Sequence, residues 1–314
     1  MQLNLENNKR ALIESALIAM ISAFFAISVI YIPVLSILIF FLPVPFIILS
    51  ARRGTKYTIL SLLISSLAIG LLTELILTGF ILIMFGPVAL VIGYCIRTKK
   101  EPFTAISIAS ALWVVTTFLI IQLIAIIGGI NFMEIIADSF KEVQLQMEEI
   151  LSMEYSKATI KAAIDNLIML IPSFLILQSV MGAFANYYLA ISVLKKIRYD
   201  YDKLPEFSKF RLPGNILLGS FIIFVLSYLT RFIEGIHFNA LLNNVIVIFI
   251  FVFYLQGIAT ISYMLKRIKT PKALRIFLII LIVVFSPLTA YIIAPLGLID
   301  AAFDIRKLRS IKKQ

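Results

Sequence analysis

The chain has 314 residues, of which 61% are hydrophobic and 14% are charged, and its formal net charge is +11. Soluble domains average about 45–50% apolar and about 25% charged residues, so this composition excludes an ordinary soluble protein and indicates a polytopic membrane protein. One cysteine, Cys95, excludes an internal disulfide, and with the single histidine, His237, it leaves no ligand set for zinc. The predicted fold class is therefore all-α, a polytopic transmembrane helical bundle.

Most of the 28 Lys and Arg residues lie in short segments between long apolar runs. Short loops rich in Lys and Arg remain on the cytoplasmic side, so these segments predict a multi-pass protein of the bacterial cytoplasmic (inner) membrane with a cytoplasmic N-terminus. Because the cations flank the spans, we expect them to interact with anionic headgroups of the lipid bilayer, and we expect no nucleic-acid partner. The segments are 9–10, 52–56, 97–100, 195–211, 266–275 and 306–313.

Residues 1–127 form a predicted N-terminal region of five spans. Pro33 predicts a turn before a short second span that carries Pro43 and Pro45. Glu74 marks the outer turn between the third and fourth spans. The predicted spans cover residues 11–31, 34–50, 57–73, 75–96 and 103–127.

Residues 128–163 are predicted as an extracytoplasmic amphipathic segment. From Ile130 to Ala163 the apolar residues recur at helical spacing, which is typical of an amphipathic helix. The segment connects an outgoing span to an incoming one, so we expect it on the extracytoplasmic face. The apolar positions are Ile136, Phe140, Val143, Met147 and Ile150.

Residues 164–314 are predicted as a C-terminal transmembrane region with a basic cytoplasmic tail. Spans are expected at 164–194, 214–233 and 240–265. A single crossing by residues 276–303 would place the basic tail outside, so we expect a break there, at Ser286-Pro287 or near Pro295. The prediction for the whole chain is about eight full spans plus a broken C-terminal helical pair.

No recognisable catalytic motif is present in the sequence. It contains no G-x-x-x-x-G-K-S/T, H-E-x-x-H or G-x-S-x-G pattern. The longest predicted cytoplasmic loop, residues 195–213, is too short to fold into a nucleotidase or kinase domain. We therefore expect no enzyme activity, no catalytic residues, no metal and no cofactor.

Polar residues inside the predicted spans are candidates for ligand binding, because burying them costs free energy unless they find partners. Gln178, Gly182 and Asn186 recur every four residues in the sixth span. They predict either the lining of a ligand cavity or hydrogen bonds that cross-link helices. Glu74 could meet a cationic ligand, or it could be a solvated acid in a turn.

Small residues form a stripe along the first span. Ala11, Ser15, Ala19 and Ala23 recur at every fourth position, which creates a flat face where another helix can pack closely. This face is a candidate partner-helix face. Packing inside the chain explains the stripe equally well.

Three features of residues 11–100 form a recognisable pattern: the small-residue stripe, a proline-bearing second span that ends in FLPVPFIILSARRG, and a fourth span that reads GPVALVIGY. In this pattern the N-terminal third resembles the S components of energy-coupling-factor vitamin transporters. Nearly the whole chain, through LQGIAT and PLGLIDAAFDIRKLR, resembles the YybS-like bacterial membrane proteins, an uncharacterised family with a domain of unknown function.

The S-component resemblance implies that a small molecule binds toward the outer side. It also implies that the first-span stripe contacts a transmembrane coupling protein that works with separate ATPases. The chain departs from the S-component pattern by its spans after the sixth and by the segment 130–163, which we expect to act as a lid. The preferred function is a non-hydrolytic small-molecule-binding or uptake subunit. The alternative is a structural or regulatory membrane scaffold without a ligand.

Overall fold

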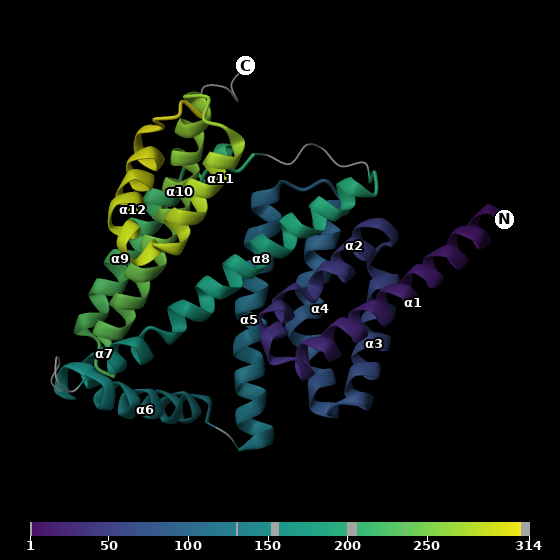
Figure 1. Cartoon of the computed structure of the whole chain (residues 1–314), viewed down its shortest axis with the longest axis horizontal. Helices are drawn as coiled ribbons and strands as arrows, with labels where there is room; N and C mark the ends of the chain where they lie inside the picture. Colours follow the sequence, from purple (N-terminus) through teal and green to yellow (C-terminus); the bar gives the residue numbers. More distant parts are fainter. Residues whose placement is uncertain (1, 130, 152–156, 200–205, 236, 309–314) are drawn as a thin grey trace. The chain divides into compact units, whose positions relative to one another are not determined.

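The computed structural model describes residues 2–129, 131–151, 157–199, 206–235 and 237–308 (Figure 1). Within these ranges the chain is helical and contains no strand, as predicted. Its contacts divide it into two compact units, which are described separately. Unit 1 contains Met1–Ile160 and Leu175–Asp202, and unit 2 contains Lys161–Phe174 and Lys203–Gln314.

Unit 1 is built from the helices of the first half of the chain and most of one later helix. Its central helix is α4, which contacts α2, α3 and α5, while α1 packs against α3 and the 3₁₀ helix η1. The elements are α1 (Gln2–Tyr31), η1 (Pro33–Phe41), α2 (Pro43–Arg53), α3 (Thr55–Leu72), α4 (Leu75–Arg97), α5 (Pro102–Gly128), α6 (Phe132–Leu151) and most of α8 (Ile171–Lys196).

Two prolines change the second predicted span. It was expected as one span over 34–50, and the structure builds the span Pro33–Arg53 from η1 followed by α2, which begins at Pro43. Pro43 and Pro45 have no N–H groups and would clash with preceding carbonyls in a continuous helix. Both prolines lie in the first turn of α2, where N–H groups have no intrahelical acceptor, so their missing N–H groups cost no hydrogen bond.

Unit 2 is centred on two helices that approach closely, α10 and α12. A Cβ atom on Gly297 would overlap the carbonyl oxygen of Phe253, and one on Gly257 would overlap that of Ile293. Only glycine therefore permits this helix spacing. The elements are most of α7 (Lys157–Met169), the start of α8, η2 (Phe207–Lys209), α9 (Ile216–Leu229), η3 (Thr230–Phe232), α10 (Phe238–Arg267), α11 (Lys272–Val284) and α12 (Ser286–Phe303).

The last apolar stretch is broken, as predicted. The break lies at Phe285, between α11 and α12, and Pro295 stays inside α12. Beyond α12, Arg306 donates hydrogen bonds to the carbonyl oxygens of Ser208 and Phe210 at 2.8 and 2.9 Å. The end of α12 thus lies against the segment Phe207–Phe210 of unit 2.

A buried ion pair joins these parts of unit 2. The side chains of Asp300 and Arg306 are only 2% and 1% exposed, and Arg306 Nη2 donates to Asp300 Oδ2 at 2.8 Å. Gln256 Nε2 donates to the same oxygen at 2.6 Å, and Gln256 Oε1 accepts from the Leu212 backbone at 3.1 Å. Each charge therefore has several partners, as a buried pair requires.

The long predicted stretch 164–194 is two helices, α7 and α8, which meet at Leu170. Pro172 lies two residues later, and a continuous helix would bring its ring against the carbonyl of residue 168. Most of α8 belongs to unit 1, whereas the sequence pattern grouped it with the C-terminal region 164–314. Tyr199 contributes to this placement because its hydroxyl donates to the Ala51 carbonyl at 2.8 Å.

The described residues include eight helical segments that are long and apolar enough to cross a membrane. They include α12 but not the shorter Ile216–Phe232, which was predicted as a full span at 214–233. Large apolar side chains such as Leu17, Phe24 and Ile37 are exposed on these segments, as expected for contact with lipid. The chain is a polytopic helical membrane protein.

The predicted amphipathic segment contains α6. Ile136, Phe140 and Met147 are half-buried as expected, but Val143 is exposed. The side chain of Ile150 and residues 130 and 152–156 lie outside what is described. The helix is confirmed, and its exposed residues include the apolar Ile135 and Leu145 as well as charged side chains.

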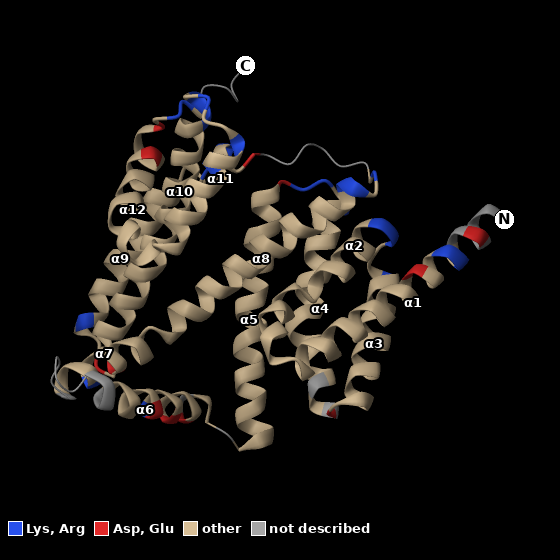
Figure 2. Ribbon diagram, viewed as in Figure 1, with Lys and Arg blue, Asp and Glu red and all other residues tan. Residues whose placement is uncertain are grey.

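Basic residues gather at one end of each unit (Figure 2). In unit 1 they lie at the ends of α2, α4 and α8, and in unit 2 near the end of α10 and the start of α11. The sequence pattern predicted that these helix ends share one side. At this end of unit 1, Glu14 is paired with Arg52 at 3.2 Å and with Arg53 at 2.8 Å.

Candidate functional site

The predicted polar stripe on α8 contains one fully buried residue, Asn186. Its Nδ2 donates to the carbonyl oxygens of Phe40 and Gly182, both at 2.8 Å. Its Oδ1 has no hydrogen-bond partner in the described part of the chain. Gln178 is half-buried. Asn186 therefore joins α8 to η1 through its Nδ2, while its buried Oδ1 can still accept a hydrogen bond.

Gly182 on α8 leaves room for the end of the Trp113 ring of α5. A Cβ atom here would lie 2.8 Å from the Cη2 and Cζ3 atoms of Trp113. Trp113 is fully buried, and its ring lies 6.5 Å from that of Phe40 and 5.9 Å from that of Phe85. Its Nε1–H has no acceptor among the described residues. Both helices that meet at Gly182 thus carry a buried polar group without a partner.

These two groups are costly to the folded chain. A buried donor or acceptor that lacks a hydrogen bond costs about 1–3 kcal/mol. Most buried polar atoms in proteins are paired, and exceptions are often completed by a ligand or water. The indole N–H of Trp113 can donate to a ligand oxygen or nitrogen, and Asn186 Oδ1 can accept from a ligand N–H or O–H.

Glu74 is not joined to this cluster. It lies at the N-cap of α4, is exposed, and makes no side-chain capping bond. Among the described residues it has no hydrogen-bond or ion-pair partner. Its surroundings are those of a solvated acid in a turn.

The small-residue stripe of α1 is used inside the chain. Ala11, Ser15, Ala19 and Ala23 are at most 7% exposed. The Ser61 hydroxyl on α3 donates to the Ser15 carbonyl at 2.9 Å across this face. Internal packing, the second interpretation of the stripe, therefore accounts for its burial. The exposed apolar face of α1 lies elsewhere and includes Phe24, which is 75% exposed.

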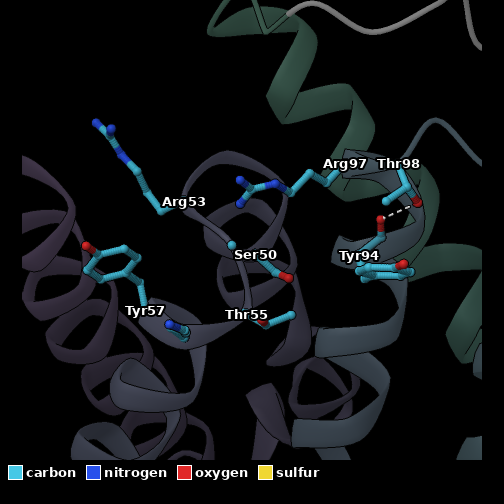
Figure 3. Close-up of a pocket in the computed structure, with 9 residues that line it drawn as sticks. Ser50, Arg53, Thr55, Tyr57, Tyr94, Arg97 and Thr98 are labelled. Carbon is cyan, nitrogen blue, oxygen red and sulfur yellow. Dashed lines mark hydrogen bonds between the residues drawn. The ribbon is translucent and has the colours of Figure 1, made fainter. Parts of the chain in front are cut away.

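A cavity of about 320 Å³ lies at the basic end of unit 1 (Figure 3). In the sequence analysis, Arg53, Lys56 and Arg97 served only to predict which helix ends face the cytoplasm. The cavity is formed by the end of α2, the turn at Gly54, the start of α3 and the end of α4. Its lining residues are Ser50, Arg53, Gly54, Thr55, Lys56, Tyr57, Tyr94, Arg97 and Thr98.

Gly54 sets the geometry of this cavity. Its φ is +93°, a conformation that glycine adopts readily and other residues rarely do. A Cβ atom here would overlap the Arg97 guanidinium, so the side chain of Arg97 lies directly against the turn. The available sequence signal was a glycine between two helices in SARRGTK, flanked by hydroxyl and basic residues.

Comparison with known proteins identifies the family. The family described as "Predicted membrane protein (DUF2232)" matches residues 20–301. The chain is also 24% identical over 307 residues to "Uncharacterized protein YybS" of Bacillus subtilis (strain 168), covering 95% of this chain and 97% of the relative. No solved structure gives a significant match. With a match over most of its length, and with the helical spans that the description requires, the chain belongs to the DUF2232 family of membrane proteins, as the YybS-like resemblance predicted.

Proposed function

We propose that this protein is a non-enzymatic, non-hydrolytic subunit of the bacterial cytoplasmic membrane that binds a small molecule for uptake, with its N-terminus in the cytoplasm. The observation that carries the proposal is that two buried polar atoms, Trp113 Nε1 on α5 and Asn186 Oδ1 on α8, have no hydrogen-bond partner among the described residues. A ligand that accepts from the first and donates to the second would remove both desolvation costs.

The surroundings favour a ligand without net charge. Aromatic rings of Phe40 and Phe85 lie beside Trp113, and among the described residues no charged side chain donates or accepts a hydrogen bond within the cluster. Aromatic walls with a few polar groups are typical of small-molecule sites. We therefore expect a small molecule with an apolar body, one hydrogen-bond donor and one acceptor.

Energy for uptake would come from a partner. The resemblance to S components supports a transmembrane coupling protein with separate ATPases. Since the predicted face at Ala11–Ala23 is covered by α3, such a partner would contact the exposed apolar side of α1, around Leu17, Met20 and Phe24.

The test is retention of a small molecule by protein purified from its native membrane, measured by native mass spectrometry. Trp113→Phe removes the indole N–H and keeps an aromatic ring, and because that N–H has no partner in the described chain, no internal hydrogen bond is lost. We expect lower retention in Trp113→Phe and in Asn186→Ala. Ser192→Ala on the exposed side of α8 is the control and should retain the ligand.

Equal retention by all variants would contradict the proposed site. Co-purification in mild detergent tests the partner: recovery of an ATPase pair supports uptake, whereas recovery of other membrane proteins without any small molecule supports the scaffold alternative.

We also propose that α6 is a lid. Its half-buried residues Ile136 and Phe140 lie on the same helical face, and α6 contacts α5. Deleting residues 136–150 should change ligand affinity while the protein still inserts into the membrane. Loss of all folded protein would count against a separable lid.

A further inference from the structure

The cavity at the basic end of unit 1 has an unbalanced positive charge. Its lining includes Arg53, Lys56 and Arg97 but no acidic residue. Arg53 is neutralised by Glu14, which accepts from its Nε and Nη2, both at 2.8 Å, and Figure 3 shows its guanidinium directed away from Ser50 and Arg97. Lys56 and Arg97 have no ion-pair partner among the residues that the structure describes. Two positive charges therefore remain available at the cavity.

Backbone donors add to this charge. Helix α3 has 18 residues and begins directly at the cavity, at Thr55. Its N-cap is Gly54, which has no side chain to cap the first-turn N–H groups. The first N–H groups of a helix have no intrahelical acceptors, and together with the helix dipole they attract anions.

A buried hydroxyl provides an independent indication of a ligand. Ser50 lines the cavity and is fully buried, yet its Oγ has no hydrogen-bond partner in the described chain. Helical Ser and Thr side chains commonly bond the carbonyl four residues earlier. Thr58 does so here with Gly54 at 3.1 Å, whereas Ser50 does not. In Figure 3 the Ser50 hydroxyl points toward the Tyr94 side of the cavity.

We propose that this cavity binds a phosphate group, carried either by an anionic phospholipid or by a soluble phosphate ester. The Arg97 guanidinium and the Lys56 ammonium supply the charge, the first-turn N–H groups of α3 donate hydrogen bonds, and the Ser50 hydroxyl donates one more. A volume of about 320 Å³ exceeds the needs of a phosphate ion alone, so the ligand carries a head group or another substituent. With the orientation proposed above, the cavity opens on the cytoplasmic side.

The test uses the full-length protein, delipidated in detergent, and two probes. Glycerol 3-phosphate binding is measured by calorimetry, and retention of phosphatidylglycerol over phosphatidylcholine by native mass spectrometry. Ser50→Ala removes one unpartnered atom, and Arg97→Gln removes one charge. Arg267→Gln, at the basic end of unit 2, makes the same charge change far along the sequence and serves as the control.

We expect at least one probe to bind the unmodified protein. Its affinity should fall by about tenfold or more in Arg97→Gln and severalfold in Ser50→Ala, and it should be unchanged in Arg267→Gln. Saturable binding of glycerol 3-phosphate identifies a soluble ester as the source, and preferential retention of phosphatidylglycerol alone identifies the lipid. Binding of neither probe, or equal losses in Arg97→Gln and Arg267→Gln, would overturn the proposal. Thermal unfolding of each variant checks that it is folded.

Discussion

Replacing Arg306 by Met should strongly destabilise unit 2. Arg306 makes two hydrogen bonds to Asp300 Oδ2, at 2.8 and 3.0 Å, and two more to the carbonyls of Ser208 and Phe210. Removing one partner of a buried ion pair costs about 3–5 kcal/mol, because the other charge stays buried without compensation. Two carbonyl groups also lose donors here, which places the expected cost at the upper end of that range.

Thermal unfolding of the full-length protein in detergent measures this effect. A cost of about 3–5 kcal/mol corresponds to a decrease in melting temperature of about 6–20 °C, on the scale of domains of about 150–250 residues. The control is Lys266→Met, which breaks the exposed pair of Lys266 with Glu206 and should cost about 0.2–1 kcal/mol.

The double variant Asp300→Leu with Arg306→Met distinguishes the mechanism. It removes both buried charges, so it should be more stable than Arg306→Met alone. If Arg306→Met is as mild as Lys266→Met, or if the double variant is no more stable than the single one, the explanation by an uncompensated buried charge is refuted.

Three further outcomes follow from the structure. Gly297→Ala should destabilise α10–α12 packing by about 1–3 kcal/mol through overlap with a backbone carbonyl, whereas Gly219→Ala, with open space around it, should be neutral or slightly stabilising in thermal unfolding. The hydrogen bond from Lys266 lowers the pKa of Glu206 below the ordinary 4.5, so the ionised carboxylate stabilises the fold above pH 4.5 and this contribution is lost as the pH falls further. The melting temperature of Glu206→Gln should therefore decrease less steeply with falling pH in this window than that of the unmodified protein. An equal decrease in both proteins would contradict this expectation. In a Cys-free background, a membrane-impermeant thiol reagent added to intact cells should label Leu145→Cys and not Lys272→Cys, and the reverse pattern would invert the proposed topology.

Local features of the sequence were enough to predict most of the helices. Apolar run length identified most of the spans, but it predicted a full span at 214–233, where the helix is shorter. Ser286-Pro287 correctly indicated the break before α12. One error occurred at a proline, since Pro172 interrupts the stretch 164–194, which was predicted to be continuous. The second span is present as Pro33–Arg53, with a change of helix type at Pro43. In each case proline interrupts a helix, but an average of hydropathy along the sequence does not reveal the interruption.

The candidate sites were much less predictable. Asn186 was recognisable as a polar residue in a span, yet its partner Phe40 is 146 residues away in the sequence. The cations at Arg53 and Arg97 were recognisable as topology signals, but the cavity that they share with Ser50 was not predicted. A single sequence shows the face of a helix on which a side chain lies, and it does not show which other helix covers that face.

The sequence by itself determined that this protein is helical, that it lies in a membrane, and which helix ends carry positive charge, because these properties depend on composition and on residues close together in the chain. Only the tertiary structure decided how the faces are used. Helix α3 covers the small-residue stripe at Ala11–Ala23, Gly182 brings Trp113 toward α8, and Gly54 brings Arg97 against the start of α3. These contacts depend on which helices pack together, and a pattern of small residues fits many partners equally well.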